Sequence, residues 1–217
     1  MKFNHQSFKN KKYLFFDFDG VIVESLNIKS EGFAELYKYL NKAENKEIVE
    51  HHIKYSGVSR YEKIKYYHKK YLNIKLNKKQ LDLECNKFSK IILKKMFKVK
   101  YVYGVKKFIY TLKKNHKIFL LSATPQNELE SILKNKDINN FFVYIGGSPK
   151  NKTFHIKKII KKERIETNKS LYFGDSLSDY NVAKKFNFEF ILRQHSLNFD
   201  IFQNINCNKI MNFSNFF

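Results

Sequence analysis

The stretch Tyr13–Ser25, which reads YLFFDFDGVIVES, constrains the fold of this chain more than any other. Tyr13–Phe16 is a run of β-prone apolar residues, which is typical of a strand buried in a parallel sheet. Asp17 and Asp19 follow directly, and strand alternation predicts that both side chains point to the same side. Because like charges this close repel, the pair predicts either a bound Mg²⁺ or one carboxyl with a raised pKa. The alternative is a strand that ends in an ordinary polar turn.

The charge of the chain is strongly positive, but its pattern argues against nucleic acid as a partner. The formal net charge is +22 over 217 residues, which would suit an anionic surface. However, only Arg60, Arg164 and Arg193 are arginines, the residue that phosphate and base recognition usually recruits. The lysines are spread along the expected helices, as on solvated helix faces. We therefore expect nucleic acid to be an unlikely partner, while the field would attract a small phosphorylated substrate.

Neither the cysteines nor the N-terminus indicate export. Cys85 and Cys207 match no metal-binding spacing and are interpreted as packed thiols in a reducing compartment. Residues 1–12 are polar, and no stretch approaches about 18 consecutive apolar residues. We expect a cytoplasmic protein that binds no membrane and is a monomer or weak dimer.

Residues 26–100 are predicted to be helical throughout. Apolar residues recur there at helical spacing, and no segment favours a strand. The expected helices are Leu26–Lys42, Ile48–Tyr55, Arg60–Leu72 and Lys78–Phe97. This pattern predicts a helical domain of residues 25–100 inserted directly behind the aspartates.

From Tyr101 the pattern changes to alternating helices and strands. The expected helices are Gly104–Asn115, Pro125–Asn135, Lys152–Lys162 and Ser178–Phe186; the expected strands are Lys117–Leu121, Phe141–Ile145, Ser170–Phe173 and Phe188–Leu192, with a weak one near Lys209–Phe213. Strands separated by helices imply right-handed crossovers and a parallel sheet covered on both faces. We expect an α/β protein with a Rossmann-like three-layer core, residues 1–24 and 101–217, and a small all-α cap inserted after the first strand.

Ligands of such a sheet bind beyond the carboxyl ends of its strands, and polar residues follow several of the expected strands. Asp175 comes directly after one strand, and Asp179 comes four residues later. Mg²⁺ prefers oxygen ligands, usually one or two carboxylates with phosphate and water. Asp17 and Asp175 are the expected direct ligands and Asp179 a ligand through water. Alternatively, Asp179 is an acidic residue favoured by a helix N-terminus.

A second strand end is suited to phosphate. Ser122 lies just ahead of a helix N-terminus, where its hydroxyl and the following backbone N–H groups, beginning with Ala123, can bind phosphate oxygens. Thr124 is the competing choice, but its place before Pro125 favours an N-cap role. Gly20 leaves backbone room for the same ligand.

The segment GGSPKNKTFHIKKII supplies a cation at a third strand end, from Lys150 or Lys152. Such a lysine would neutralise both a carboxylate and phosphoryl oxygens. Lys152 is favoured because it opens the following helix.

Taken together, the pieces FDFDGVIVES, LLSATP, GSPKNK and GDSLSD resemble the four motifs of the haloacid dehalogenase superfamily, in the branch of phosphoglycolate phosphatases and β-phosphoglucomutases with a helical cap. The resemblance implies that Asp17 is a nucleophile, that Asp19 is the general acid and base, and that the backbone carbonyl of Asp19 binds the metal. It also implies that Lys152 supports catalysis and that Arg60, in the cap segment SGVSRYEK, contacts the distal group of the substrate.

The resemblance and the residues together predict a Mg²⁺-dependent phosphatase. It would hydrolyse a small phosphorylated metabolite, a sugar phosphate or a phosphoglycolate-like acid, through an aspartyl-phosphate. A phosphomutase of the β-phosphoglucomutase type is the first alternative. A basic protein that binds nucleic acid or processes its ends is the second.

Overall fold

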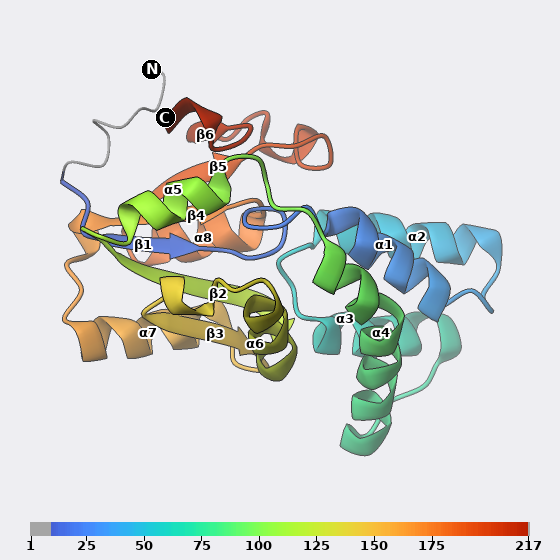
Figure 1. Ribbon diagram of the computed structural model, residues 1–217. Helices are drawn as coiled ribbons and strands as arrows, with labels where there is room; N and C mark the ends of the chain where they lie inside the picture. The colour runs from blue at the N-terminus through green and yellow to red at the C-terminus, as the bar shows by residue number, and fades with distance from the viewer. Residues whose placement is uncertain (1–9, 217) are drawn as a thin grey trace.

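The computed structural model describes residues 10–216 and contains one six-stranded parallel sheet (Figure 1). The strands lie in the order β3-β2-β1-β4-β5-β6, so β1 is central. Their bounds are β1 Tyr13–Phe16, β2 Lys117–Pro125, β3 Tyr144–Ser148, β4 Ser170–Gly174, β5 Glu189–Arg193 and β6 Asn208–Ile210. Every neighbouring pair is parallel. The expected α/β fold is confirmed.

The helices fall into two groups along the chain. The first four after β1 follow one another without a strand: α1 Leu26–Leu36, α2 Lys42–Lys54, α3 Arg60–Leu72 and α4 Lys78–Lys98. The others connect the strands: α5 Val105–Leu112, α6 Gln126–Asn135, α7 Lys152–Glu163 and α8 Leu177–Lys185. Short 3₁₀ turns occur at Asn139–Phe141, Thr167–Lys169, Asp200–Phe202 and Ser214–Phe216.

The sheet is the middle of three layers because its strands are apolar on both faces. In β1, Leu14 and Phe16 belong to a core that also contains residues of α5 and α6. Phe15, between them, belongs to a second core with residues of α7 and α8. Successive apolar side chains of a strand therefore pack into the cores on opposite faces of the sheet, as expected for a buried parallel sheet.

The helices α1–α4, which we call the cap, lie together beyond the carboxyl ends of the strands (Figure 1). Phe33, Tyr67 and Phe88 are buried at the centre of this group, and the Phe33 and Phe88 ring centroids are 4.4 Å apart. Residues 26–100 contain no extended strand, as the sequence predicts. The cap thus covers the edge of the sheet at which Asp17 lies.

Several element boundaries differ from the prediction. The first expected helix, Leu26–Lys42, ends at Leu36, and the second begins at Lys42 instead of Ile48. The Asn41 side chain caps α2 in a reciprocal pair with Glu44. This S/T/N-x-x-E pattern was a readable start signal that hydrophobic periodicity alone did not reveal.

The expected strand Phe141–Ile145 is displaced toward the C-terminus. Asn139–Phe141 forms a 3₁₀ turn, and β3 begins at Tyr144 and continues to Ser148. The run from Phe141 to Val143 is apolar, so periodicity could not locate the start of the strand. Gly146 and Gly147 have low strand propensity, but pairing with β2 keeps them extended.

Three further expectations concern the whole chain. No helix within residues 10–216 is long and apolar enough to cross a membrane. Cys85 is buried and Cys207 is partly buried, and both are free thiols. The polar segment 1–9 lies outside the described residues.

Candidate active site

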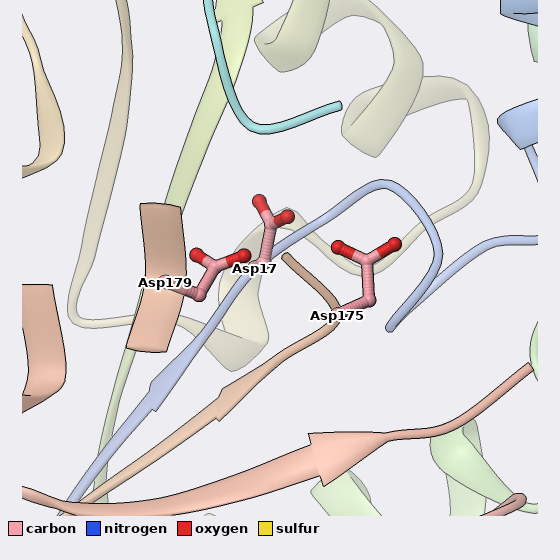
Figure 2. A group of neighbouring side chains, drawn as sticks. All are labelled: Asp17, Asp175 and Asp179. Atoms are coloured by element: carbon pink, nitrogen blue, oxygen red, sulfur yellow. The ribbon is translucent and has the colours of Figure 1, made fainter. Parts of the chain in front are cut away.

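Three aspartates from two strand ends and one helix meet at the carboxyl edge of the sheet (Figure 2). Asp17 follows β1 and Asp175 follows β4, while Asp179 lies in the first turn of α8. A carboxylate oxygen of each lies within 4.8 Å of the others, and all three side chains are buried. The predicted convergence of these strand ends is therefore present.

Lys152 places a buried ammonium between two of these carboxylates. Its Nζ lies 2.9 Å from Asp17 Oδ1 and 2.5 Å from Asp179 Oδ1. Lys152 is the first residue of α7, and Asn151 caps that helix. Lys150, the alternative that the sequence left open, is exposed and its Nζ lies 5.1 Å from the Phe154 ring. The geometry therefore selects Lys152.

The electrostatics of the cluster favour a bound cation. Burial raises the pKa of Asp17, the charge of Lys152 lowers it, and Asp179, Asp175 and Asp19 raise it, with a net shift well above its usual range. Burial and Asp179 likewise raise the pKa of Asp175. The pKa of Lys152 is also raised, because Asp17 and Asp179 outweigh the effect of burial. One ammonium does not balance three carboxylates.

Asp179 is both a member of the cluster and a helix-capping residue. Its Oδ2 accepts a 2.6 Å hydrogen bond from Ser176 Oγ, and the two residues form a reciprocal capping box at the start of α8. Its Oδ1 also accepts from the hydroxyl of Tyr172. The two interpretations of Asp179 from the sequence are thus compatible in one side chain.

Asp175 is held by the loop after β5. His195 Nε2 lies 3.2 Å from Asp175 Oδ2, and Asn198 Nδ2 donates to the Asp175 carbonyl oxygen at 2.9 Å. Burial, with Arg193 adding to it, lowers the pKa of His195 to about 4, so the ring is neutral at pH 7. A neutral ring can still donate to Asp175 and fix its orientation.

Gly20 supports the same carboxylate by its lack of a side chain. Its φ is +75°, a conformation that favours glycine, and a Cβ there would overlap the Asp175 carboxylate. Its N–H donates to the carbonyl of Val23 at 2.8 Å. Gly20 therefore makes room for Asp175 in addition to the phosphate role expected of it.

Asp19 does not share the cluster but turns to a separate set of partners. Its carboxylate pairs with Lys29 Nζ at 2.5 Å and accepts from Ser25 Oγ at 2.6 Å and from Thr124 Oγ1 at 2.9 Å. Burial alone would raise the pKa of Asp19, but Lys29 and these hydrogen bonds lower it overall. Of the two outcomes that the sequence left open for this pair, a raised pKa is present at Asp17, while the Asp19 side chain lies outside the three-carboxylate cluster.

The sequence predicted that Thr124 is the N-cap of the following helix, and this prediction was wrong. The residue at the N-cap of α6 is Pro125, and no side chain caps that helix. Thr124 is buried, and its hydroxyl links Lys29 to Asp19. The strand β2 continues through Thr124, which leaves its side chain pointing to the site instead of to the helix.

Ser122 and Ala123 border an open cavity of about 420 Å³ between the sheet edge and the cap. Lys152 lines the same cavity, as do Gly57, Val58 and Ser59 of the loop before α3. The Ser122 hydroxyl accepts from Thr124 N–H at 3.0 Å and lies 3.3 Å from Asp19 Oδ2. The predicted phosphate-binding segment therefore lies next to the acidic cluster.

Arg60 is the first residue of α3, in the cap, and its guanidinium is already paired. It makes two 2.8 Å bonds to the carboxylate of Glu128 in α6 and a 2.6 Å bond to Ser89 Oγ. The Phe88 ring centroid lies 4.6 Å from Arg60 Cζ. In this arrangement Arg60 joins the cap to the core, and the expected contact with a substrate stays a prediction.

Comparison with known proteins gives the family. A family model described as haloacid dehalogenase-like hydrolase matches residues 14–192, most of the chain. The chain belongs to this family. No curated protein sequence is significantly similar to it. The family of this haloacid dehalogenase-like hydrolase is thus known from its sequence. Its fold can be compared with solved structures.

Solved structures with the same fold cover nearly the whole chain. A predicted phosphoglycolate phosphatase from Haemophilus somnus is similar with a TM-score of 0.75 at 16% identity, covering 95% of this chain and 96% of that one. The β-phosphoglucomutase of Clostridium difficile gives 0.74 at 15% identity, covering 94% and 92%. CbbY from Rhodobacter sphaeroides, solved with xylulose-1,5-bisphosphate, gives 0.74 at 12% identity, covering 94% and 95%. At these identities the likeness establishes the fold.

The acidic cluster of this hydrolase fits a divalent cation. Three buried carboxylates from β1, β4 and α8 present oxygen atoms within 4.8 Å, the donor type that Mg²⁺ prefers. Two of them have raised pKa values because they lie close together in a buried site, which a cation would relieve.

Sequence reasoning missed two groups of this site. His195 and Asn198 follow β5, so the same strand-end rule that found Asp175 could have found them. Lys29 carried no readable signal, because it is one of many lysines in the chain. Its place beside Asp19 depends on how the cap folds back over the sheet.

Proposed function

We propose that this protein is a Mg²⁺-dependent phosphatase of small phosphorylated metabolites. The observation that carries the proposal is the buried Lys152 between Asp17 and Asp179, with Asp175 beside them. A phosphoryl group brought to Asp17 needs positive charge on both sides, and this arrangement supplies one cation and a carboxylate site for another.

In the proposed reaction, a carboxylate oxygen of Asp17 attacks phosphorus and the bond from phosphorus to the leaving oxygen breaks. Lys29 holds Asp19 ionised, so Asp19 must first take up a proton, from the phosphomonoester or from solvent, before it gives one to that oxygen. The carboxylate then takes a proton from the water that cleaves the aspartyl-phosphate. Asp17, Asp175 and, through water, Asp179 would hold Mg²⁺, with the backbone carbonyl of Asp19. When bound, the metal would offset the negative charge between nucleophile and phosphate.

The residues of the protein supply the rest of the environment. Lys152 keeps an ammonium 2.9 Å from Asp17 Oδ1. The backbone at Ser122 and Ala123, which borders the cavity, would bind phosphoryl oxygens. The cap borders the cavity from the other side with residues 57–59, and would limit the access of bulk water.

The test is phosphate release by the purified protein from a panel of small phosphomonoesters, with Mg²⁺ and with EDTA. We expect release only with the metal, and none from Asp17→Asn. A folded protein that releases no phosphate from any member of the panel would contradict the proposal. Phosphorus NMR with a hexose 1-phosphate distinguishes hydrolysis, which gives inorganic phosphate, from phosphomutase activity, which gives the 6-phosphate.

A further inference from the structure

Lys63 of α3 is a buried lysine whose pKa burial lowers well below its ordinary value, so its charged form is disfavoured. The residue is only 2% exposed, and its Nζ contacts His52 Nδ1 at 2.8 Å and the His52 carbonyl oxygen at 3.3 Å. The Phe33 ring centroid is 5.8 Å away. Within residues 10–216, no carboxylate forms an ion pair with Lys63. A charge buried in this way needs a counter-charge.

Lys63 faces a small hollow between the cap and the core. The hollow is about 20 Å³ in volume, and its lining includes His52, Ser56 and Lys63 of the cap and Ala123 of the core. Val58 and Ala123 also line the larger cavity beside Lys152. The hollow is thus next to the cavity in which the phosphoryl group is proposed to bind.

The other two cations that line the hollow are already neutralised. Lys29 is paired with Asp19 at 2.5 Å, and Arg60 is paired with Glu128 at 2.8 Å. Burial and the charge of Lys29 lower the pKa of Lys63, while Asp19 and Asp175 raise it. An anion in the hollow would offset this cost of burial and could take the Lys63 N–H that His52 does not use.

We propose that Lys63 and His52 form a subsite for a carboxylate group of the substrate. This inference rests on the proposed phosphatase function and names its substrate class: a short phosphomonoester with a carboxylate at the far end. The size of the hollow favours this group, because its volume suits one or two water-sized groups, whereas a second phosphate is larger. Arg60, by contrast, already directs both terminal nitrogens of its guanidinium to the Glu128 carboxylate.

The experiment compares matched substrates in the wild type, Lys63→Met and Lys65→Met. Lys65 is an exposed lysine of the same helix and serves as the control. The substrates are 3-phosphoglycerate with glycerol 3-phosphate, and 2-phosphoglycolate with 2-hydroxyethyl phosphate; each pair differs by a carboxylate against an alcohol. A propane-1,3-diol bisphosphate tests whether a phosphate takes the same place.

We expect the wild type to prefer the carboxylates and Lys63→Met to lose that preference. The loss should be about 10- to 100-fold in kcat/KM, mainly through KM, since a hydrogen bond to a charged group is worth about 1.5 to 3 kcal/mol. Turnover of the two alcohols should not change. Thermal melting of Lys63→Met should be equal to or above that of the wild type, because the cost of burying this lysine has been removed.

Equal losses on carboxylate and alcohol substrates, or a wild type without carboxylate preference, would overturn the subsite. A wild type that prefers the bisphosphate, with that preference lost in Lys63→Met, would overturn the assignment to a carboxylate. If the wild type hydrolyses neither member of either pair, the result contradicts the proposed phosphatase function itself. That result differs from a loss of the preference for carboxylate over alcohol substrates.

Discussion

At the scale of single residues, the site depends on charges that have no access to water. Lys152 is 6% exposed and, within residues 10–216, is the only cation that forms an ion pair with Asp17 or Asp179. Removing one partner of a buried ion pair leaves the other charge unpaired, which usually costs more than the pair contributes. Both the stability and the activity of the enzyme should therefore depend on Lys152.

Replacing Lys152 by Met should abolish measurable phosphate release and lower the free energy of unfolding by about 3 to 5 kcal/mol. The reason is that Asp17 and Asp179 would then repel each other in a buried site. Urea denaturation and a phosphate-release assay with Mg²⁺ measure the two effects. Lys157, an exposed lysine of the same helix, is the matched control, and Lys157→Met should be close to the wild type. Equal behaviour of the two variants would contradict the role given to Lys152.

A second prediction concerns the hydroxyl of Thr124. Thr124→Val removes the hydrogen bond to Asp19 and should reduce kcat by about tenfold, whereas Thr124→Ser should keep it, since a bond to a charged group is worth about 1.5 kcal/mol. If Thr124 served only the helix α6, kcat would not change in either variant. Thr111→Val, on the exposed side of α5, controls for the loss of a threonine hydroxyl. Steady-state kinetics on one substrate provide the measurement.

At the scale of elements, Arg60 and Glu128 connect the cap to the core. Their two 2.8 Å bonds join α3 to α6, and Ser89 Oγ of α4 donates to the same carboxylate at 2.8 Å. Both side chains are less than one-tenth exposed, so solvent screens the pair little. The pair therefore couples the position of the cap to the position of the helix that follows the phosphate-binding segment.

This coupling predicts the outcome of a double-mutant cycle with Arg60→Met and Glu128→Met. Each single variant should lose about 3 to 5 kcal/mol of unfolding free energy, and the double variant should be no worse than either single one. KM should rise in both single variants, because both loosen the cap. If Arg60 instead contacts the substrate directly, only Arg60→Met will raise KM. Additive losses of stability would contradict the coupling.

The same elements show what the sequence could predict. The strand-end positions of Asp17, Asp175 and Lys152 followed from local patterns, because a buried strand and the residue after it are adjacent in the chain. The partner of Arg60 lies 68 residues away, and the cap lysine beside Asp19 lies ten residues away on a helix whose direction is set by packing. Local periodicity carries no information on such contacts, so they required the structure.

At the scale of the whole molecule, the cap and the sheet together bury a site with more acid than base. Although the formal charge of the chain is +22, burial and neighbouring carboxylates raise the pKa of Asp17 and Asp175. Without metal, the folded protein should therefore hold protons in this cluster that the unfolded chain has lost. Net charge did not predict this, because most lysines are on the surface and the site is local.

The last prediction links this protonation to metal binding. A carboxyl whose pKa is raised on folding contributes stability that is present below its unfolded pKa and is lost as pH rises through its folded pKa. The contribution of this cluster to the unfolding free energy without metal should therefore fall as pH rises above the ordinary carboxyl range. The stabilisation by Mg²⁺ should grow over the same interval, because binding displaces the protons. Thermal melting with Mg²⁺ or EDTA at several pH values measures the effect, and calorimetry in buffers of different ionisation enthalpy should detect proton release. Asp175→Asn should remove most of the difference between Mg²⁺ and EDTA, whereas the exposed Asp200→Asn should retain it. A stabilisation by Mg²⁺ that is the same at every pH would mean that the cluster is fully ionised before the metal binds.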